Sequence, residues 1–307
     1  MSRIPLVLSA LVMTSLTTGS AELSAQEPQI GHVRTLSSPI DAGSGGLEVD
    51  ADGNVYTADF GATLSSGPPG TRVWRITPAG EVSVYAEGFR GASGNAIGPD
   101  GTFYQANIAG GTVSRVDQDG KVSTFVASGL AAPVGLTFDN QGRLVVANCG
   151  SNTLARVDED GEAEVFASSN LLQCPNNLVL GGDGNFYVSN FYNGDVVRIT
   201  PQGETTRLVT LPGGNNGHLV FTDGVFYVAA RAANQIYEVT MDGESRVIAG
   251  SGDRGVDDGP AMEATLSLPN DLALSPDGRT LYWNDVAAPG PGTQTLTPTV
   301  VRALTLR

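Results

Sequence analysis

Basic residues are scarce in this sequence of 307 residues. It has 17 lysines and arginines against 32 aspartates and glutamates, which gives a net charge of −15. A charge of this sign disfavours binding to nucleic acid or to an anionic membrane, and it is compatible with cations or neutral solutes as ligands. We therefore expect no nucleic-acid partner.

A long apolar run is also missing. The longest apolar stretch, Ile4–Met13, follows Arg3 and is too short to cross a bilayer, so we expect no membrane span. Small residues come after it, which is typical of a signal peptide. We predict that residues 1–25 are such a peptide, with cleavage after Ala21 or after Ala25, and that the protein is exported, either periplasmic or secreted.

Familiar catalytic and metal-binding motifs are absent as well. The sequence contains no GxSxG elbow, no HExxH and no phosphate-binding loop. Three short stretches, at residues 50–53, 117–120 and 158–161, resemble the start of a calcium loop. None has a glutamate at the twelfth position, so we interpret all three as turns.

Four short apolar runs do occur in residues 175–209, separated by glycine-containing turns. They are Asn177–Leu180, Phe186–Ser189, Asp195–Thr200 and Thr206–Val209. Short runs with β-branched and aromatic residues, bounded by Gly, Asp and Asn, are typical of strands. Glycine supplies the positive φ that tight hairpin turns require. The stretch therefore predicts a four-stranded antiparallel meander, whose strands we name a to d.

This unit recurs along the chain. The glycines of the a–b turn are Gly53, Gly101, Gly142, Gly184, Gly224 and Gly278, and those of the c–d turn are Gly80, Gly120, Gly161, Gly203 and Gly243. A period of about forty residues with four strands per repeat is the signature of a β-propeller. We predict an all-β fold: one six-bladed β-propeller of four-stranded antiparallel blades, occupying residues 26–307.

The sixth repeat is one strand short. It ends after its third strand, Thr299–Leu306, and a fourth strand is available at the other end of the chain in His32–Ser37. Pairing these two segments would close the ring and remove its open edges. We therefore predict that the N-terminal strand completes the last blade.

The meander also sorts the loops into two faces. The glycine turns fall on one face, the turn face, and the b–c loops and d-to-a connections fall on the other, the loop face. Three loop-face segments are long and come from neighbouring blades: Phe60–Arg72, Val286–Pro298 and Gly250–Pro269. Function is commonly carried by loops on a rigid scaffold. Two interpretations stay open: these segments form a site, or they cover the closure seam.

The two cysteines belong to neighbouring blades. Cys149 ends strand b of the third blade and Cys174 precedes strand a of the fourth, so both lie on the loop face. An exported protein permits a disulfide between them. We predict the Cys149–Cys174 bond, and two unpaired core thiols are the alternative.

The segment Ile248–Gly278 resembles the joining segment of NHL-repeat propellers, and the repeats Asp52–Phe60 and Asp183–Phe191 resemble it too. The pattern is also similar to the SMP-30-like gluconolactonase/regucalcin and streptogramin-lyase propellers, from about residue 32 to the end. The resemblance implies the propeller fold. It leaves the activity open, because such propellers include lactonases, lyases and binding modules.

Comparison of the repeats with one another singles out candidate site residues at the start of strand a. The first position of strand a is Gly46, Gly94, Gly135, Asn177, His218 and Asp271 in the six blades. Glu48 and Asn95 stand where the other blades have mostly apolar or small residues. Buried carboxylates are costly unless they are paired or bind a cation. A salt bridge is the other explanation of Glu48.

The last position of strand b shows a regular polar pattern instead. It is Asp59, Asn107, Asn148, Asn190, Ala230 and Asp285 in successive blades. Because an Asn or Asp recurs in five blades, we interpret it as structural, with the side chain capping the backbone of the loop that follows.

Gluconolactonase-like propellers hold a divalent metal in the channel through a Glu, an Asn and an Asp. The resemblance transfers the Asn to Asn176 in the sequence PNNL, and Asn270 stands in the equivalent PNDL. Glu48 matches the Glu only loosely, and blade 5 has Asn216 and His218 where the family has Asp. The hypothesis is one divalent cation, Ca, Mg or Zn, held by Glu48, Asn176, Asn270 and Asp271, with no organic cofactor.

A histidine at the mouth of the channel is a candidate general base. Streptogramin-lyase-like propellers use a His and a Mg-binding Glu, which by resemblance assigns catalytic roles to His218 and Glu48. Arg231 begins a loop on the same face and is a candidate to orient a carboxylate or lactone oxygen. We predict Asn95, Asn176 and Asn177 as substrate-binding residues. We expect six residues to line one pocket on the loop face: Glu48, Asn95, Asn176, His218, Asn270 and Asp271.

Two hypotheses for the function follow. The first is an exported propeller with a channel-mouth site for a small molecule, acting as a metal-assisted gluconolactonase-like hydrolase or a lyase. The alternative is a non-catalytic NHL-type module that binds a small molecule or a protein on the loop face. In both cases we expect a monomer.

Overall fold

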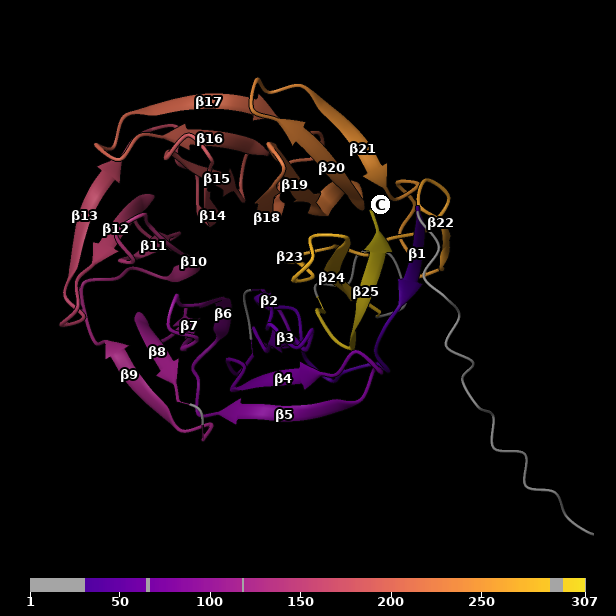
Figure 1. The fold of residues 1–307 in the computed structure, drawn as a ribbon, viewed down its shortest axis with the longest axis horizontal. Helices are drawn as coiled ribbons and strands as arrows, with labels where there is room; N and C mark the ends of the chain where they lie inside the picture. The colour runs from indigo at the N-terminus through magenta and orange to yellow at the C-terminus, as the bar shows by residue number, and fades with distance from the viewer. Residues whose placement is uncertain (1–30, 65–66, 118, 288–294, 307) are drawn as a thin grey trace, which may run out of the picture.

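The protein forms a ring of six antiparallel sheets around a central channel (Figure 1). This computed structural model describes residues 31–64, 67–117, 119–287 and 295–306. The prediction of an all-β, six-bladed propeller is confirmed. The predicted signal peptide lies outside the described residues. Within the described part, no helix has the length and hydrophobicity that a membrane crossing requires.

Blades 1 to 5 each consist of four strands that follow one another in the sequence, with strand a innermost and strand d at the rim. Blade 1 comprises β2 (Leu47–Val49), β3 (Val55–Ala58), β4 (Arg72–Ile76) and β5 (Val82–Glu87). Blade 2 comprises β6 (Ala92–Ile97), β7 (Phe103–Asn107), β8 (Thr112–Val116) and β9 (Val122–Val126). Blade 3 comprises β10 (Pro133–Phe138), β11 (Leu144–Asn148), β12 (Thr153–Val157) and β13 (Ala163–Ser168). Blade 4 comprises β14 (Pro175–Leu180), β15 (Phe186–Asn190), β16 (Asp195–Ile199) and β17 (Thr205–Thr210). Blade 5 comprises β18 (Asn216–Thr222), β19 (Val225–Ala230), β20 (Gln235–Thr240) and β21 (Ser245–Ala249).

Blade 6 joins the two ends of the described chain. Its strands are β23 (Leu272–Leu274), β24 (Thr280–Val286), β25 (Thr299–Thr305) and β1 (His32–Thr35). In the antiparallel pairing of β1 with β25, Val33 lies opposite Leu304, which confirms the predicted closure. One addition was not predicted: the short strand β22 (Gly259–Pro260) pairs with the outer edge of β1 and covers it.

The turn glycines adopt the conformation for which they were identified. Gly184 of an a–b turn has φ 79°, and Gly203 of the following c–d turn has φ 93°. The other nine predicted turn glycines also have positive φ. Because this region is accessible to glycine at no steric cost, these residues fix where each hairpin reverses.

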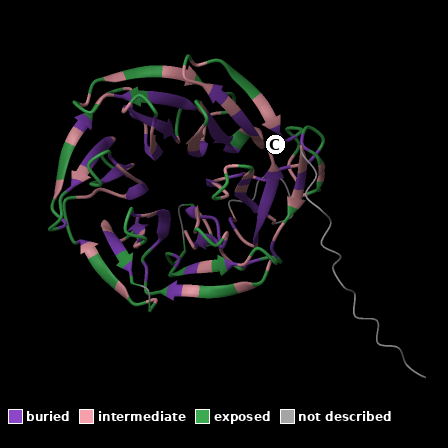
Figure 2. Cartoon of the chain, in the orientation of Figure 1, coloured by how far each residue is buried: buried purple, intermediate pink, exposed green. Residues whose placement is uncertain are grey.

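The hydrophobic core lies between neighbouring blades. The second strands β3, β11 and β15 are buried throughout, whereas the outermost strands β5, β9, β13 and β17 show exposed residues at the rim (Figure 2). In one cluster, Val145 and Leu154 of blade 3 pack against Leu178 and Phe186 of blade 4. Each blade therefore buries its faces against its two neighbours.

A buried arginine forms ion pairs that stabilise blade 6. Arg302 of β25 is fully buried, and its guanidinium contacts Asp285 at 3.1 Å and Asp258 at 2.9 Å. Asp258 also accepts a hydrogen bond of 2.9 Å from the backbone N–H of Thr35. These contacts link β24, β25, β1 and the connection into blade 6.

The polar residues that end strand b are structural, but they bond to a different segment from the one predicted. Asn107, Asn148 and Asn190 accept a hydrogen bond from the backbone N–H of Arg90, Ala131 and Gln173, respectively, each at 3.1 Å. These donors belong to the connection that enters strand a of the same blade. Asp59 bonds within the loop that follows it, where it accepts a hydrogen bond from the backbone N–H of Thr71.

Two of the long loop-face segments contact each other. Thr63 of the blade 1 loop forms a bridge with Thr295 of the blade 6 loop, and the N–H of Leu296 donates to the carbonyl oxygen of Ala62 at 2.8 Å. The described ends of these loops therefore meet over the seam between the last and first blades, in the sector where the sequence placed them.

Candidate functional site

Two cavities lie along the central channel. The mouth cavity opens on the loop face and has a volume of about 310 Å³. The inner cavity lies toward the turn face and has a volume of about 280 Å³. The two share no lining residue. Concave sites of this size with a few convergent polar groups are typical of small-molecule binding.

A waist of glycine backbone separates the two cavities. A β-carbon on Gly46 would lie 2.6 Å from the backbone nitrogen of Asn95, and one on Gly135 would lie 2.5 Å from Cα of Asn177. At Gly94 it would collide with the carbonyl oxygen of Val134. In blades 1 to 3 a side chain is therefore excluded at this position, because the inner strands of neighbouring blades approach each other backbone to backbone.

The residues that directly follow strand b form a ring around the mouth cavity. In four blades the residue is apolar, and in blade 5 it is an arginine: Phe60, Ile108, Cys149, Phe191 and Arg231. Leu64, Tyr192 and Leu296 extend this wall outward. The mouth cavity is thus apolar over most of its circumference.

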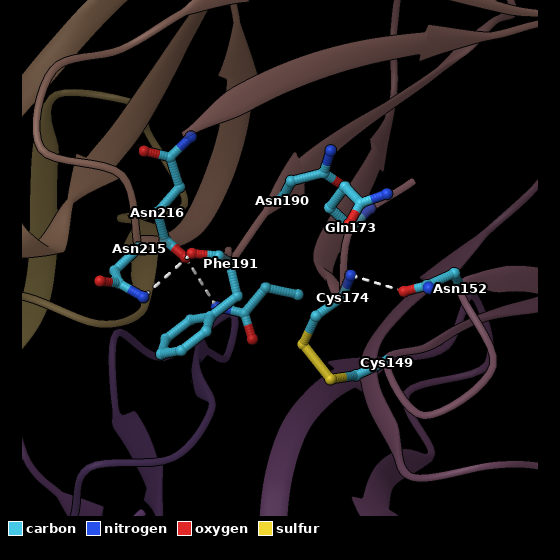
Figure 3. Close-up of a disulfide and its surroundings, with 9 residues drawn as sticks. Cys149, Asn152, Gln173, Cys174, Asn190, Phe191, Asn215 and Asn216 are labelled. Carbon is cyan, nitrogen blue, oxygen red and sulfur yellow. Dashed lines mark hydrogen bonds between the residues drawn. A yellow bond between two sulfur atoms is a disulfide. The ribbon is translucent and has the colours of Figure 1, made fainter. Parts of the chain in front are cut away.

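The predicted disulfide between Cys149 and Cys174 is present and forms part of this wall (Figure 3). Next to it, the side-chain oxygen of Asn152 accepts a hydrogen bond of 2.7 Å from the backbone N–H of Cys174. The disulfide and this hydrogen bond together link blade 3 to blade 4 at the rim of the cavity. A disulfide is consistent with export.

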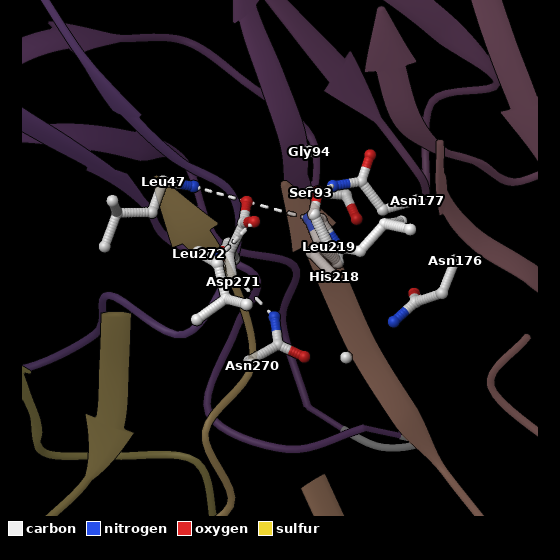
Figure 4. Close-up of polar contacts among 12 residues, drawn as sticks. Leu47, Ser93, Gly94, Asn176, Asn177, His218, Leu219, Asn270, Asp271 and Leu272 are labelled. Carbon is white, nitrogen blue, oxygen red and sulfur yellow. Dashed lines mark hydrogen bonds and ion pairs between the residues drawn. The ribbon is translucent and has the colours of Figure 1, made fainter. Parts of the chain in front are cut away.

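The polar side of the mouth cavity centres on His218. Its Nδ1 lies 2.8 Å from Oδ2 of Asp271, and both side chains are almost fully buried (Figure 4). Asp271 is held in turn: its carboxylate accepts hydrogen bonds from the backbone N–H of Leu47 at 2.5 Å and of Leu272 at 2.7 Å. Asp271 belongs to the inner cavity, so the pair crosses the waist.

This pairing decides what the imidazole can do. A carboxylate only accepts hydrogen bonds, so the proton of the contact belongs to Nδ1 of His218. Nε2 would then carry the lone pair, and His218 lines the mouth cavity. A histidine oriented by a carboxylate, with a free nitrogen at a cavity, has the arrangement of a general base.

Two asparagines flank this histidine in the same cavity. The side-chain N–H of Asn176 donates to the carbonyl oxygen of Asn216 at 3.0 Å, and that of Asn270 donates to the carbonyl oxygen of Ser44 at 2.8 Å. These bonds occupy the nitrogens and leave the amide oxygens as hydrogen-bond acceptors at the cavity.

Arg231 is the cation of the mouth cavity. It begins the short 3₁₀ turn η1 (Arg231–Ala233) and is only 6 % exposed. Burial and, to a smaller extent, the positive charge of Arg254 together lower the pKa of its guanidinium to about 10. Among the described residues, no carboxylate lies within ion-pair distance of it.

The inner cavity contains the remaining predicted residues: Glu48, Asn95, Asn177 and Asp271. Glu48 makes no salt bridge with the described residues, and burial, together with the negative charge of Asp271, raises the pKa of its carboxyl group to about 8. Asn95 is buried, and neither its amide nitrogen nor its oxygen has a partner in the described part of the chain. The residues expected in one pocket are therefore divided between two cavities.

This division bears on the metal hypothesis. Of the four expected ligands, Asn176 and Asn270 line the mouth cavity, whereas Glu48 and Asp271 line the inner one. Both oxygens of Asp271 already accept hydrogen bonds. Within the described ranges, no group of three or more His, Cys, Asp or Glu side chains is arranged to hold a metal ion. The expected ligand set does not fit a single cation site, so we derive no chemical step through a metal.

Sequence reasoning missed the ring of residues after strand b. Its signal was available, since Arg231 interrupts a column that is otherwise Phe60, Ile108, Cys149 and Phe191. The pairing of His218 with Asp271 was also missed, although both occupy the first position of strand a in neighbouring blades. Equivalent positions of adjacent inner strands meet at the channel.

Known structures share this fold. Virginiamycin B lyase from Staphylococcus aureus is 16% identical with a TM-score of 0.60, and the match covers 89% of this chain and 98% of that one. A gluconolactonase from Xanthomonas campestris is 15% identical with a TM-score of 0.67, covering 90% of this chain and 89% of that one. No curated protein matches the sequence.

The sequence itself carries a family match. Residues 29–239, about two thirds of the chain, match the virginiamycin B lyase family. The matched part contains His218 and Arg231 of the mouth cavity and ends before Asp271. On the strength of this match and of a fold shared with streptogramin lyase and gluconolactonase propellers, the chain belongs to the virginiamycin B lyase family.

Proposed function

We propose that the protein is an enzyme that binds a small molecule in the mouth cavity and acts on it as a lyase or hydrolase, with His218 as the general base. In a lyase reaction, Nε2 of His218 would take a proton from carbon while the leaving group departs from the neighbouring atom. In a hydrolase reaction, it would take the proton of an attacking water. We also propose that the protein is exported and monomeric.

One observation carries this proposal: the 2.8 Å contact between Nδ1 of His218 and the buried Asp271 at a ligand-sized cavity. With the proton on Nδ1, Nε2 would carry the lone pair. The carboxylate fixes the ring orientation and stabilises the imidazolium that forms when the base accepts a proton. The family supports the reaction class. A catalytically inactive histidine-to-alanine variant of the Staphylococcus aureus virginiamycin B lyase has been crystallised with quinupristin.

The alternative function is a non-catalytic binding module. It is favoured by the apolar character of the ring formed by Phe60, Ile108, Cys149 and Phe191, which suits ligand capture without chemistry. The two functions differ in what the loss of His218 does: it abolishes turnover in an enzyme and changes only affinity in a binding module.

The test uses the purified protein with two probes, quinupristin and glucono-lactone, whose consumption is followed by mass spectrometry. We expect turnover of at least one probe by the wild type and a loss of about a hundredfold or more in His218→Ala, the range typical of a missing general base. The matched control is His32→Ala, because His32 is the other histidine of the chain and lies in β1, away from the mouth cavity. Equal turnover by the two variants would refute the role of His218. If the wild type consumes neither probe, the binding-module alternative stands.

A further inference from the structure

The mouth cavity is electropositive in a strongly acidic protein. The chain carries a net charge of −15, yet the described residues that line this cavity include Arg231 and no aspartate or glutamate. Asp271 lines the inner cavity beyond the waist, and its carboxylate lies 2.8 Å from His218. The sign of the local charge is thus opposite to that of the whole molecule.

Arg231 is not used by the fold in the way the other buried arginine is. Arg302 is fully buried between Asp258 and Asp285, which neutralise it. Arg231 is also buried, but within the described residues no carboxylate forms an ion pair with it. An uncompensated buried charge is costly to folding, so the structure alone does not account for it.

Arg231 also breaks the repeat pattern at a cavity position. The corresponding residues of blades 1 to 4 are apolar, namely Phe60, Ile108, Cys149 and Phe191. Blade 5 lies across the ring from blade 2, so Arg231 and Ile108 approach the cavity from opposite sides (Figure 1). The cavity therefore has one cationic wall in blade 5 and an apolar wall in blades 1 and 2.

We propose that the ligand of the mouth cavity is an organic carboxylate with an apolar body, whose carboxylate pairs with Arg231 and whose body packs on Phe60 and Ile108. The planar guanidinium offers two parallel N–H donors, which match the two oxygens of a carboxylate. The apolar body of the ligand would also cover Leu64, a lining residue that is 44% exposed. This inference rests on the proposed function, because it concerns the same mouth cavity and names the class of substrate that binds there.

The experiment compares acids with their neutral amides of the same shape. Octanoate, benzoate and 4-phenylbutyrate, each beside its primary amide, are titrated by calorimetry into the wild type at fixed ionic strength. At least one acid should bind, and about ten- to a hundredfold more tightly than its amide, because a hydrogen bond to a charged group is stronger than a neutral one. In Arg231→Gln this preference should vanish.

A control variant and a binding readout that needs no turnover make the outcome interpretable. Arg279→Gln removes the same charge from an exposed position beside an a–b turn, on the opposite face, and should keep the preference for the acid. Calorimetry measures binding without turnover, so failure of the catalytic proposal can be told apart from failure of this one. The inference is overturned if no acid binds, if the amides bind as well as the acids, or if Arg231→Gln retains the preference. Arg231→Gln should melt at or above the wild-type temperature, because it removes an uncompensated buried charge.

Discussion

Replacement of Glu48 by glutamine should stabilise the protein at neutral pH and not at acid pH. Glu48 lines the inner cavity without a cationic partner among the described residues, and burial raises the pKa of its carboxyl group from the ordinary 4.5 to about 8. Between these two values the folded state keeps the group protonated while the unfolded state ionises it. The folded state then binds more protons, so stability falls as the pH rises through this window.

The size of the effect follows from the same two values. One pKa unit is worth about 1.4 kcal/mol, so at pH 7 the folded protein loses up to about 3 kcal/mol relative to acid pH. Glu48 is partly accessible from the cavity, which reduces this figure, and we expect about 1–3 kcal/mol. Glutamine keeps the shape and cannot ionise, so Glu48→Gln should recover this free energy of unfolding at pH 7.

The assay is urea unfolding of the wild type and of Glu48→Gln, followed by tryptophan fluorescence at about pH 4 and at pH 7. The difference in unfolding free energy should be near zero at the lower pH, because the carboxyl group is then neutral in both states. Glu159→Gln is the control, since Glu159 is exposed in a c–d turn. A difference that is absent at pH 7, or equal at both pH values, would show that Glu48 is ionised and compensated in the folded protein.

Three further predictions concern the scaffold. Arg302→Met should lower the free energy of unfolding by about 3–5 kcal/mol in urea titrations, because it leaves Asp285 buried without its counter-ion. A loss below about 1 kcal/mol would contradict a stabilising role of the Arg302 ion pairs. Deletion of residues 26–38 should expose the edge of the last blade and lower the melting temperature sharply, and an unchanged melting curve would contradict the shared blade. Changing Cys149 and Cys174 together to serine should cost about 3–4 kcal/mol for a loop of 25 residues. Digestion of exported protein without reductant should release their peptides joined, and fully alkylated cysteines would exclude the bond.

The fold could be predicted because glycines that form turns recur at a regular spacing in the sequence. Gly184 and the equivalent glycines adopt positive φ wherever the period of about forty residues placed them. The closing strand was predictable too, because an incomplete sixth repeat needs a partner and only His32–Ser37 was available. Strand β22 was not predictable: two residues, Gly259 and Pro260, carry no strand pattern and pair only because β1 presents an open edge to them.

The candidate site was less predictable, because depth along a strand is not visible in aligned repeats. Asn176 and Asn177 are neighbours in the sequence, yet they line different cavities on the two sides of the waist. The waist exists because Gly46, Gly94 and Gly135 lack side chains, and only the three-dimensional approach of the backbones shows that they form a barrier. The contact between two side chains was equally hidden: the sequence does not show that Asp271 lies 2.8 Å from His218.

The shared last blade has a kinetic consequence. Blades 1 to 5 are each continuous in the sequence and can form as soon as their own residues are available. Blade 6 needs Val33 beside Leu304, one of the most distant pairings of the fold, and such contacts slow folding because a long loop must close before they stabilise the chain. Leu64 and Leu296, which come from the two blades that meet at the seam, reach the mouth cavity only when the ring is shut. The mouth cavity is therefore among the last parts of the molecule to form, and binding of the proposed ligand would report that folding has finished.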